Sequence, residues 1–141
     1  MSLLLPNAAA RGRFVTSPTA SVRSKVPFIQ TIELFEAEDL IASARWFTTA
    51  TDGVVQLLDI HVSPKHQRQG AGTRLFKRMQ READTFLQTR GQRLRRVFVN
   101  AEQKTNITAR AFLTGLGFHH VQTISNTLRD EDILVYLLGC D

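Results

Sequence analysis

Several features of other protein classes are missing from this sequence of 141 residues. Its single cysteine, Cys140, excludes a disulfide within the chain and favours a reducing compartment. No apolar run approaches the ~20 residues that cross a bilayer, so we expect neither a transmembrane helix nor a membrane partner. No repeat or low-complexity linker divides the chain, and its length suits one domain. We therefore expect a single domain over residues 1–141, located in the cytoplasm.

Acidic residues are scarce at the start of the chain. The net charge is +5 and no acid precedes Glu33, which leaves a basic, divergent segment over residues 1–27 without helical periodicity. A transit peptide has such a composition, but we favour a structural first element of the domain. Further basic residues surround a glycine-rich loop, so an anionic ligand explains them better than nucleic acid, whose grooves interleave exposed aromatic rings. These residues are Lys65, Arg68, Arg74, Lys77, Arg78 and Arg81.

That loop, Gln67-Arg68-Gln69-Gly70-Ala71-Gly72-Thr73, is the most informative part of the sequence. The apolar residues before it predict a buried strand over 54–62, and those after it predict an amphipathic helix over 72–90, capped by Gly91. Backbone N–H groups at a helix N-terminus bind anions. The loop therefore predicts a site for a phosphate-bearing ligand, and an ordinary turn that needs two glycines is the alternative.

The spacing of the loop excludes the better-known phosphate-binding motifs. No Gly-Lys-Ser or Gly-Lys-Thr follows, which excludes a Walker loop. The dinucleotide fingerprint needs three glycines, and only Gly70 and Gly72 are present. What remains is a loop that holds a diphosphate mainly with its backbone, helped by Arg68 and Lys65.

The remaining pattern predicts a mixed α/β fold. Strands are predicted over residues 28–35, 40–48, 54–62, 94–99, 121–124 and 133–138, and helices over residues 72–90 and 106–116. One strand–helix–strand crossover makes strands 54–62 and 94–99 parallel neighbours in a mainly antiparallel sheet. Ligands of such sheets bind at the carboxyl ends of the parallel strands, where the glycine loop begins.

These residues resemble the GNAT superfamily of acyl-CoA-dependent N-acyltransferases. Asp59-Ile60-His61-Val62-Ser63-Pro64 followed by Gln67-x-x-Gly70-x-Gly72 is similar to the family signature, an Arg or Gln, two residues, Gly, one residue, then Gly or Ala. The resemblance covers about residues 28–138 and implies a three-layer α/β fold with splayed central strands, here with an abbreviated N-terminal helical region. A second block resembles the family's second helix and its Gly-Phe exit, with Asn106, Ala109, Phe112, Gly117 and Phe118.

The resemblance implies an enzyme that transfers an acyl group, usually acetyl, from acetyl-CoA to a primary amine of a small molecule, peptide or protein. The backbone of Ile60, His61 and Val62 would pair with the pantetheine arm, and an N–H group there would polarise the thioester. Asn106 would contact the pantetheine or phosphate region. The pyrophosphate would bind the loop, formed by Gln67, Arg68, Gln69, Gly70, Ala71, Gly72 and Thr73.

The chain departs from the family pattern where protons are transferred. Leu113 occupies the position of a tyrosine that protonates the leaving thiolate in many members. Gln56 or Leu58 occupies the position where many members have a carboxylate base. The candidate catalytic residues are therefore His61, because histidine is the side chain suited to proton transfer near neutral pH, Asp59, for which a structural role is the alternative, and Tyr136. No metal site is predicted, because the adjacent His119 and His120 lack further ligands at suitable spacing.

The acceptor is left open by the sequence. An open cleft would suit a peptide or protein amine, whereas a homodimer that closes the cleft would suit a small amine. A non-catalytic module that binds acyl-CoA is the alternative function, motivated by Leu113. Binding of nucleic acid through the basic N-terminus is the third and least favoured interpretation.

Overall fold

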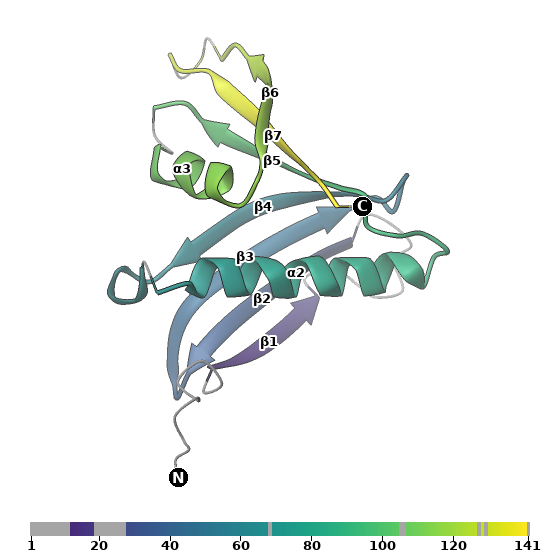
Figure 1. Ribbon diagram of the computed structural model, residues 1–141, viewed down its shortest axis with the longest axis vertical. Helices are drawn as coiled ribbons and strands as arrows, with labels where there is room; N and C mark the ends of the chain where they lie inside the picture. The colour runs from purple at the N-terminus through teal and green to yellow at the C-terminus, as the bar shows by residue number, and fades with distance from the viewer. Residues whose placement is uncertain are drawn as a thin grey trace.

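The computed structural model describes residues 12–18, 28–67, 69–104, 107–126, 128 and 130–140. Seven strands form one sheet in the order β1-β2-β3-β4-β5-β7-β6 (Figure 1). All neighbouring strands are antiparallel except β4 and β5. The predicted mixed α/β fold with one parallel pair is confirmed. The elements are β1 (Gly12–Pro18), β2 (Phe28–Glu36), β3 (Asp39–Thr48), β4 (Val54–Val62), the 3₁₀ helix η2 (Pro64–His66), α2 (Ala71–Gln88), β5 (Arg96–Glu102), α3 (Ile107–Gly115), β6 (His119–Ile124) and β7 (Ile133–Gly139).

The first strand was not predicted. Gly12–Pro18, within the segment expected to be divergent, forms β1 and pairs with β2 along its whole length. Its two large apolar residues, Phe14 and Val15, are adjacent rather than alternating, so the period of a strand is not visible in the sequence. The predicted abbreviation of the N-terminal helical region falls on residues 1–11 and 19–27, which lie outside the described residues.

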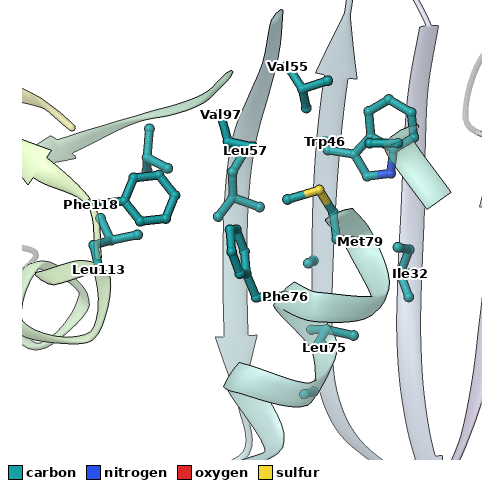
Figure 2. Packing of buried hydrophobic residues seen from close by; sticks show 14 of the residues in the cluster. Ile32, Trp46, Val55, Leu57, Leu75, Phe76, Met79, Val97, Leu113 and Phe118 are labelled. Atoms are coloured by element: carbon teal, nitrogen blue, oxygen red, sulfur yellow. The ribbon is translucent and has the colours of Figure 1, made fainter. Parts of the chain in front are cut away.

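One face of α2 builds the core with the sheet. Leu75, Phe76 and Met79 are buried and point towards β3 and β4 (Figure 2). Trp46 is fully buried beneath α2, where its ring contacts Phe86 edge-on with the centroids 5.9 Å apart. Each such side chain contributes about 1.5–3 kcal/mol by burial. This packing fixes α2 on the sheet and, with it, the loop at the N-terminus of the helix.

Two glycines end the helices as the sequence predicts. Gly91 follows α2 with a φ of 74°, and Gly117 follows α3 with a φ of 102°, conformations that glycine adopts without strain. In both cases the residue after the glycine donates its N–H to the carbonyl five residues earlier, at 2.9 and 3.0 Å. These bonds define Schellman caps. They fix where each helix turns back towards the sheet.

The ends of several elements differ from the prediction: β6 begins at His119 rather than residue 121, and β5 ends at Glu102 rather than residue 99. The helix predicted over residues 72–90 is α2 over Ala71–Gln88, and the strand predicted from residue 94 begins at Arg96. The N–H of Leu94 is bound by the Asp84 carboxylate at 2.8 Å, so it is not available to a strand ladder. A side chain of α2 therefore sets the start of β5.

Candidate functional site

The two parallel strands separate after a short paired stretch. β4 and β5 pair only where Val54–Gln56 lies beside Arg96–Phe98. On its other edge β4 carries one extra residue, because Arg45 of β3 lies opposite Asp59 whereas Trp46 lies opposite Leu57. Such a bulge bends a strand and locally disrupts its pairing. The predicted splay of the central strands is thus present, and a one-residue bulge at Leu58 marks its start.

The extra residue shifts the in-and-out alternation of the β4 side chains by one position. Before it, Leu57 faces the core. After it, Ile60 and Val62 lie opposite the buried alanines of β3, on the same face as Leu57, while Asp59 and His61 lie on the other face. Asp59 and His61 therefore share one face, as the sequence predicts. The apolar face of β4 continues to the glycine loop.

A first cavity of about 650 Å³ lies between the end of β4, the glycine loop and α3. It contains most residues that were predicted to hold the cofactor, and it adds His66, Thr108 and Phe112. We refer to it as the loop cavity. Its lining is Ile60, His61, Val62, His66, Gln67, Gly70, Ala71, Gly72, Thr73, Thr108, Ala109 and Phe112.

The two glycines of the loop have different roles. Gly70 is the N-cap of α2 with a φ of 79°, and no side chain caps the helix there. Nothing lies within 4 Å of where its Cβ would be. By contrast, a Cβ on Gly72 would lie 3.1 Å from the Phe112 ring and 3.3 Å from Val62. Gly70 thus allows the turn that opens the helix N-terminus towards an anion, and Gly72 allows α2 and α3 to approach.

The glutamines of the loop bind backbone carbonyls of the preceding segment. The Gln67 amide donates to the Val62 carbonyl at 3.2 Å, and the Gln69 amide donates to the Lys65 carbonyl at 3.4 Å. Both bonds hold the loop near the end of β4 rather than directing an amide into the cavity. Arg68 and Asn106, two further predicted cofactor contacts, lie outside the described residues.

A second cavity of about 590 Å³ occupies the space between the diverging halves of β4 and β5. It shares Ile60 and Ala109 with the loop cavity, so the two adjoin. We refer to it as the wedge cavity. Its lining includes two carboxylates and two amides among apolar groups: Leu57, Leu58, Asp59, Ile60, Val99, Asn100, Ala101, Glu102, Ala109, Leu113, Asn126 and Ile133.

The candidate catalytic residues of β4 are placed at different cavities. His61 is exposed and lines the loop cavity. Asp59 lines the wedge cavity, and its Oδ2 accepts hydrogen bonds from Arg45 Nε at 2.8 Å and Nη2 at 2.5 Å. The hydrogen bond from Arg45 to Asp59, followed by their charge attraction, raises the pKa of Arg45 above its usual range. The structure therefore gives Asp59 the structural partner that the sequence left as an alternative.

Tyr136 and Leu113 are both buried, but only Leu113 reaches a cavity. Tyr136 is 5% exposed, and its hydroxyl oxygen accepts a hydrogen bond from Arg110 Nε at 3.1 Å. It lines neither cavity. Leu113 is 1% exposed and lines the wedge cavity. An apolar side chain thus occupies the place where the family resemblance implies a proton donor.

Sequence reasoning missed three of the four polar residues of the wedge cavity, all but Asp59. Asn100 and Glu102 lie at the carboxyl end of β5, and Asn126 follows β6. The rule that ligands bind at the carboxyl ends of parallel strands could have indicated Glu102, because β5 is the parallel partner of β4. Asn126 comes from the far end of the sheet and carries no local signal.

Two further searches cover only the described part of the chain. Within it, no group of three or more His, Cys, Asp or Glu side chains is arranged to hold a metal ion. No helix there is long and apolar enough to span a membrane.

Comparison with solved structures finds the same fold in several acetyltransferases. A structure assigned to the GNAT family, from Desulfovibrio desulfuricans, is 23% identical with a TM-score of 0.67, covering 79% of this chain and 69% of that one. The ribosomal-protein-S18-alanine N-acetyltransferase from Escherichia coli is 18% identical with a TM-score of 0.60, covering 90% and 94%. The PaiA N-acetyltransferase from Thermoplasma acidophilum, in complex with coenzyme A, is 16% identical with a TM-score of 0.55, covering 76% and 59%.

The sequence itself matches a family model. No curated protein matches the chain. Residues 19–118, however, match the model of the acetyltransferase (GNAT) family, which includes the bulged strand, the glycine loop, both described helices and the wedge between β4 and β5. This chain therefore belongs to the GNAT family of acetyltransferases.

Proposed function

We propose that this protein transfers an acetyl group from acetyl-CoA to a primary amine, by direct attack of the amine on the thioester. We place it in the cytoplasm, which its single cysteine supports. The observation that carries the proposal is the loop cavity, where a helix N-terminus without a side-chain cap, a positive-φ glycine and the end of a splayed strand converge.

The loop cavity suits a long, anionic thioester. The N–H groups of Ala71, Gly72 and Thr73 belong to the first turn of α2 and would receive the pyrophosphate, where donors and helix dipole reinforce each other. The backbone of Ile60–Val62 lies beyond the last residue of β4 that pairs with β5. That edge, where the Val62 carbonyl accepts the Gln67 amide, would pair with the pantetheine arm and bring the thioester to the junction of the two cavities.

The wedge cavity suits the acceptor amine. It adjoins the loop cavity through Ile60 and Ala109, so an amine bound there would reach a thioester at the junction. Glu102 and Asp59 line it, and carboxylates attract an ammonium group. We assign the amine to Glu102 because this carboxylate lies at the carboxyl end of β5, the parallel partner of β4, where ligands of such sheets bind.

The reaction needs positioning more than covalent catalysis. The amine nitrogen forms a bond to the thioester carbon, and the carbon–sulfur bond breaks. The bound ammonium first gives one proton to a base, and the nitrogen loses a second proton as the amide forms. The departing thiolate takes up one proton. Orientation of the amine and an N–H donor at the developing oxyanion would supply much of the rate, several kcal/mol together.

Three side chains were predicted to transfer protons, and we rank them as candidates by their access to the cavities and by their hydrogen-bond partners. His61 is exposed at the loop cavity, so we propose it as the base, acting through water. Asp59 is held by Arg45, which favours a structural role. Tyr136 lines neither cavity and its oxygen is bound by Arg110, so we rank it last.

The proposal is tested by thiol release from acetyl-CoA in the presence of a panel of primary amines. The panel contains small amines, a diamine and peptides with free N-termini. Turnover with any of them supports transfer, and a preference for peptides supports an open acceptor cleft. If a small amine is preferred, sedimentation should reveal a homodimer. Absence of thiol release across the panel would contradict the proposal.

The chain offers a matched pair of glycines for testing the cofactor assignment. Gly70 and Gly91 both have a positive φ, at 79° and 74°, and both have open space around a new Cβ. Alanine at either costs about 1–2 kcal/mol of stability through the left-handed conformation. We expect Gly70→Ala to weaken coenzyme A binding about tenfold and Gly91→Ala to leave it unchanged, measured by calorimetry. Equal affinities in the two variants would remove the loop from the cofactor site.

A non-catalytic module that binds acyl-CoA is the second candidate, favoured by one observation. Leu113 is 1% exposed at the wedge cavity, where it can donate no proton. The module predicts tight binding of acetyl-CoA without thiol release on any amine. Leu113→Tyr discriminates further, because restored proton donation should raise the turnover of an enzyme but not create turnover in a module.

A further inference from the structure

One histidine in the lining of the loop cavity has a nitrogen without a partner. In the part of the chain that the structure describes, the Nδ1 atom of His66 is the one buried side-chain nitrogen or oxygen that makes no hydrogen bond. Buried polar atoms in native proteins are nearly always paired, so an unpaired one requires an explanation. Its desolvation costs stability, and a role in binding would account for that cost.

The backbone around His66 is held in place. His66 ends the 3₁₀ helix η2, which begins at Pro64, and its N–H donates to the Ser63 carbonyl at 2.8 Å. The next residue, Gln67, donates its amide to the Val62 carbonyl at 3.2 Å. The ring of His66 is therefore carried by a short segment that is anchored on both sides, beside the end of β4.

The surroundings of Nδ1 indicate where the ring proton lies. A neutral imidazole has one N–H group and one bare nitrogen. An orphaned N–H group is rarer in a protein interior than an unpaired acceptor, so we assign the proton of His66 to Nε2. Unlike Nδ1, Nε2 is not among the buried atoms without a partner, and the described residues make no hydrogen bond to it. His66 thus has an accessible N–H donor at Nε2.

The loop cavity has few other side-chain donors for an anion. Among the described residues that line it there is no lysine or arginine. The amide of Gln67 is already bound by the Val62 carbonyl, and Thr73 and Thr108 contribute only hydroxyl groups. A hydrogen bond to a charged oxygen is about twice as strong as one between neutral groups. An N–H group of His66 would therefore add substantially to the binding of a phosphate.

We propose that His66 donates its Nε2–H group to the pyrophosphate of acetyl-CoA, in addition to the N–H groups of α2. This role rests on the proposed function, because it requires coenzyme A in the loop cavity. His66 lines that cavity together with Gly70 and Thr73, where the pyrophosphate is placed. A ring that only fills the cavity wall is the alternative role.

The test is calorimetric titration of the full-length protein with coenzyme A. His66→Phe keeps an aromatic ring but removes both nitrogens, so affinity should fall about 10–100-fold through loss of a hydrogen bond to a charged group. His66→Gln places an amide N–H near the position of Nε2 and should bind within about threefold of the wild type. Dephospho-coenzyme A keeps the pyrophosphate but lacks the 3′-phosphate, so His66→Phe should weaken its binding by the same factor.

Thermal unfolding gives a readout that does not involve the cofactor. His66→Phe removes the unpaired Nδ1, so the free variant should be at least as stable as the wild type. His119→Phe is the matched control, because it makes the same change at an exposed histidine that lines neither cavity. It should leave coenzyme A affinity unchanged.

Three outcomes would overturn the proposal: unchanged coenzyme A affinity in His66→Phe, a loss in His66→Gln as large as in His66→Phe, or a loss that is absent with dephospho-coenzyme A. The last outcome would assign the ring to the 3′-phosphate. Coenzyme A binding without thiol release on any amine would contradict acetyl transfer and leave the role of His66 intact. A wild-type protein that does not bind coenzyme A would contradict both.

Discussion

The two adjoining cavities are built in opposite ways. The loop cavity depends on backbone, namely the first turn of α2, a positive-φ glycine and the end of β4. The wedge cavity depends on side chains that five separate elements or loops bring together, with Glu102, Asn100 and Asn126 as its polar groups besides Asp59. The first can bind a ligand portion that is the same in every acetyl-CoA reaction. The second is free to differ from one acceptor to another.

This difference explains why the sequence predicted the cofactor site but not the acceptor site. A backbone site requires glycine and helix-start signals within a few residues of each other, so residues 67–73 display it in sequence. A side-chain site requires only that the fold bring suitable groups together, and Asn126 and Asp59 are 67 positions apart in the chain. The loop therefore indicated the GNAT family in the sequence, whereas the residues of the wedge cavity gave no comparable signal.

The largest expected effect breaks the backbone site at Gly72. Valine there would press on the Phe112 ring, only 3.1 Å from a new Cβ, and on Val62. We expect coenzyme A affinity to fall at least 100-fold and the free energy of unfolding to fall by about 1–3 kcal/mol from overpacking. Calorimetric titration and thermal unfolding measure the two effects.

A glycine on α3 provides the control for this change. Gly115 has open space around a new Cβ. Gly115→Ala should leave coenzyme A affinity unchanged and stabilise the protein by up to about 1 kcal/mol through helix propensity. Normal coenzyme A binding by Gly72→Val would mean that the packing of Phe112 against α2 is not needed for the cofactor site.

The second prediction tests whether the wedge cavity binds the amine while the loop cavity binds acetyl-CoA. Glu102→Gln removes the charge proposed to hold the amine, so kcat/KM for the amine should fall about 10–100-fold. The KM for acetyl-CoA should stay unchanged, because Glu102 does not line the loop cavity. Steady-state kinetics with each substrate varied in turn gives both constants.

His61→Gln is the companion variant. If His61 is the base, its loss should remove the acidic limb of the pH profile of kcat and leave the KM for the amine near the wild-type value. An unchanged amine KM in Glu102→Gln would place the acceptor outside the wedge cavity. An unchanged pH profile in His61→Gln would assign the proton to water or another group.

The smallest effect concerns a carboxylate outside both cavities. The hydrogen bond from the N–H of Leu94, helped by Arg93 and Gln88, lowers the pKa of Asp84 below its usual range. A lowered folded pKa means stability that is present above the unfolded value of about 3.9 and lost as the pH falls through the folded pKa. Asp84→Ala should thus lose about 1.5–3 kcal/mol near neutral pH and less in acid.

Asp84→Asn is the matched control, because its amide oxygen can still accept the bond from Leu94. Its loss should be smaller, and urea unfolding at pH 3 and pH 7 measures the difference. If Asp84→Ala destabilises the protein equally at both pH values, the charge of Asp84 contributes nothing to folding. An effect of either variant on the KM for the amine would show that the start of β5 is coupled to the wedge cavity.

Local patterns predicted most of the fold. The apolar face of α2, the parallel pairing of β4 with β5, and the caps at Gly91 and Gly117 each depend on residues close in sequence, and the structure contains them all. β1 was missed because Phe14 and Val15 do not alternate with polar residues. Its strand conformation depends on pairing with β2, which no local period reveals.

The candidate site was predicted less completely, for a related reason. The bulge at Leu58 lies within an apolar run, Leu57-Leu58, where one extra apolar residue leaves no mark on the sequence pattern. The Arg45–Asp59 pair needs the register of β3 against β4, which the bulge itself sets. The catalytic assignments of His61, Asp59 and Tyr136 stay predictions, and the surroundings of each side chain are now described.

The opening between β4 and β5 coincides with one extra residue in β4, at Leu58, rather than with a particular side chain. Deleting Leu58 would leave Asp59 opposite Arg45 and Ile60 opposite Ala44, so each side chain would keep its present face while the extra residue disappears from the ladder. The sheet would gain a continuous ladder and lose its opening. A single extra residue in one strand therefore accompanies the opening between β4 and β5, and its removal is the direct test of whether the bulge creates that opening.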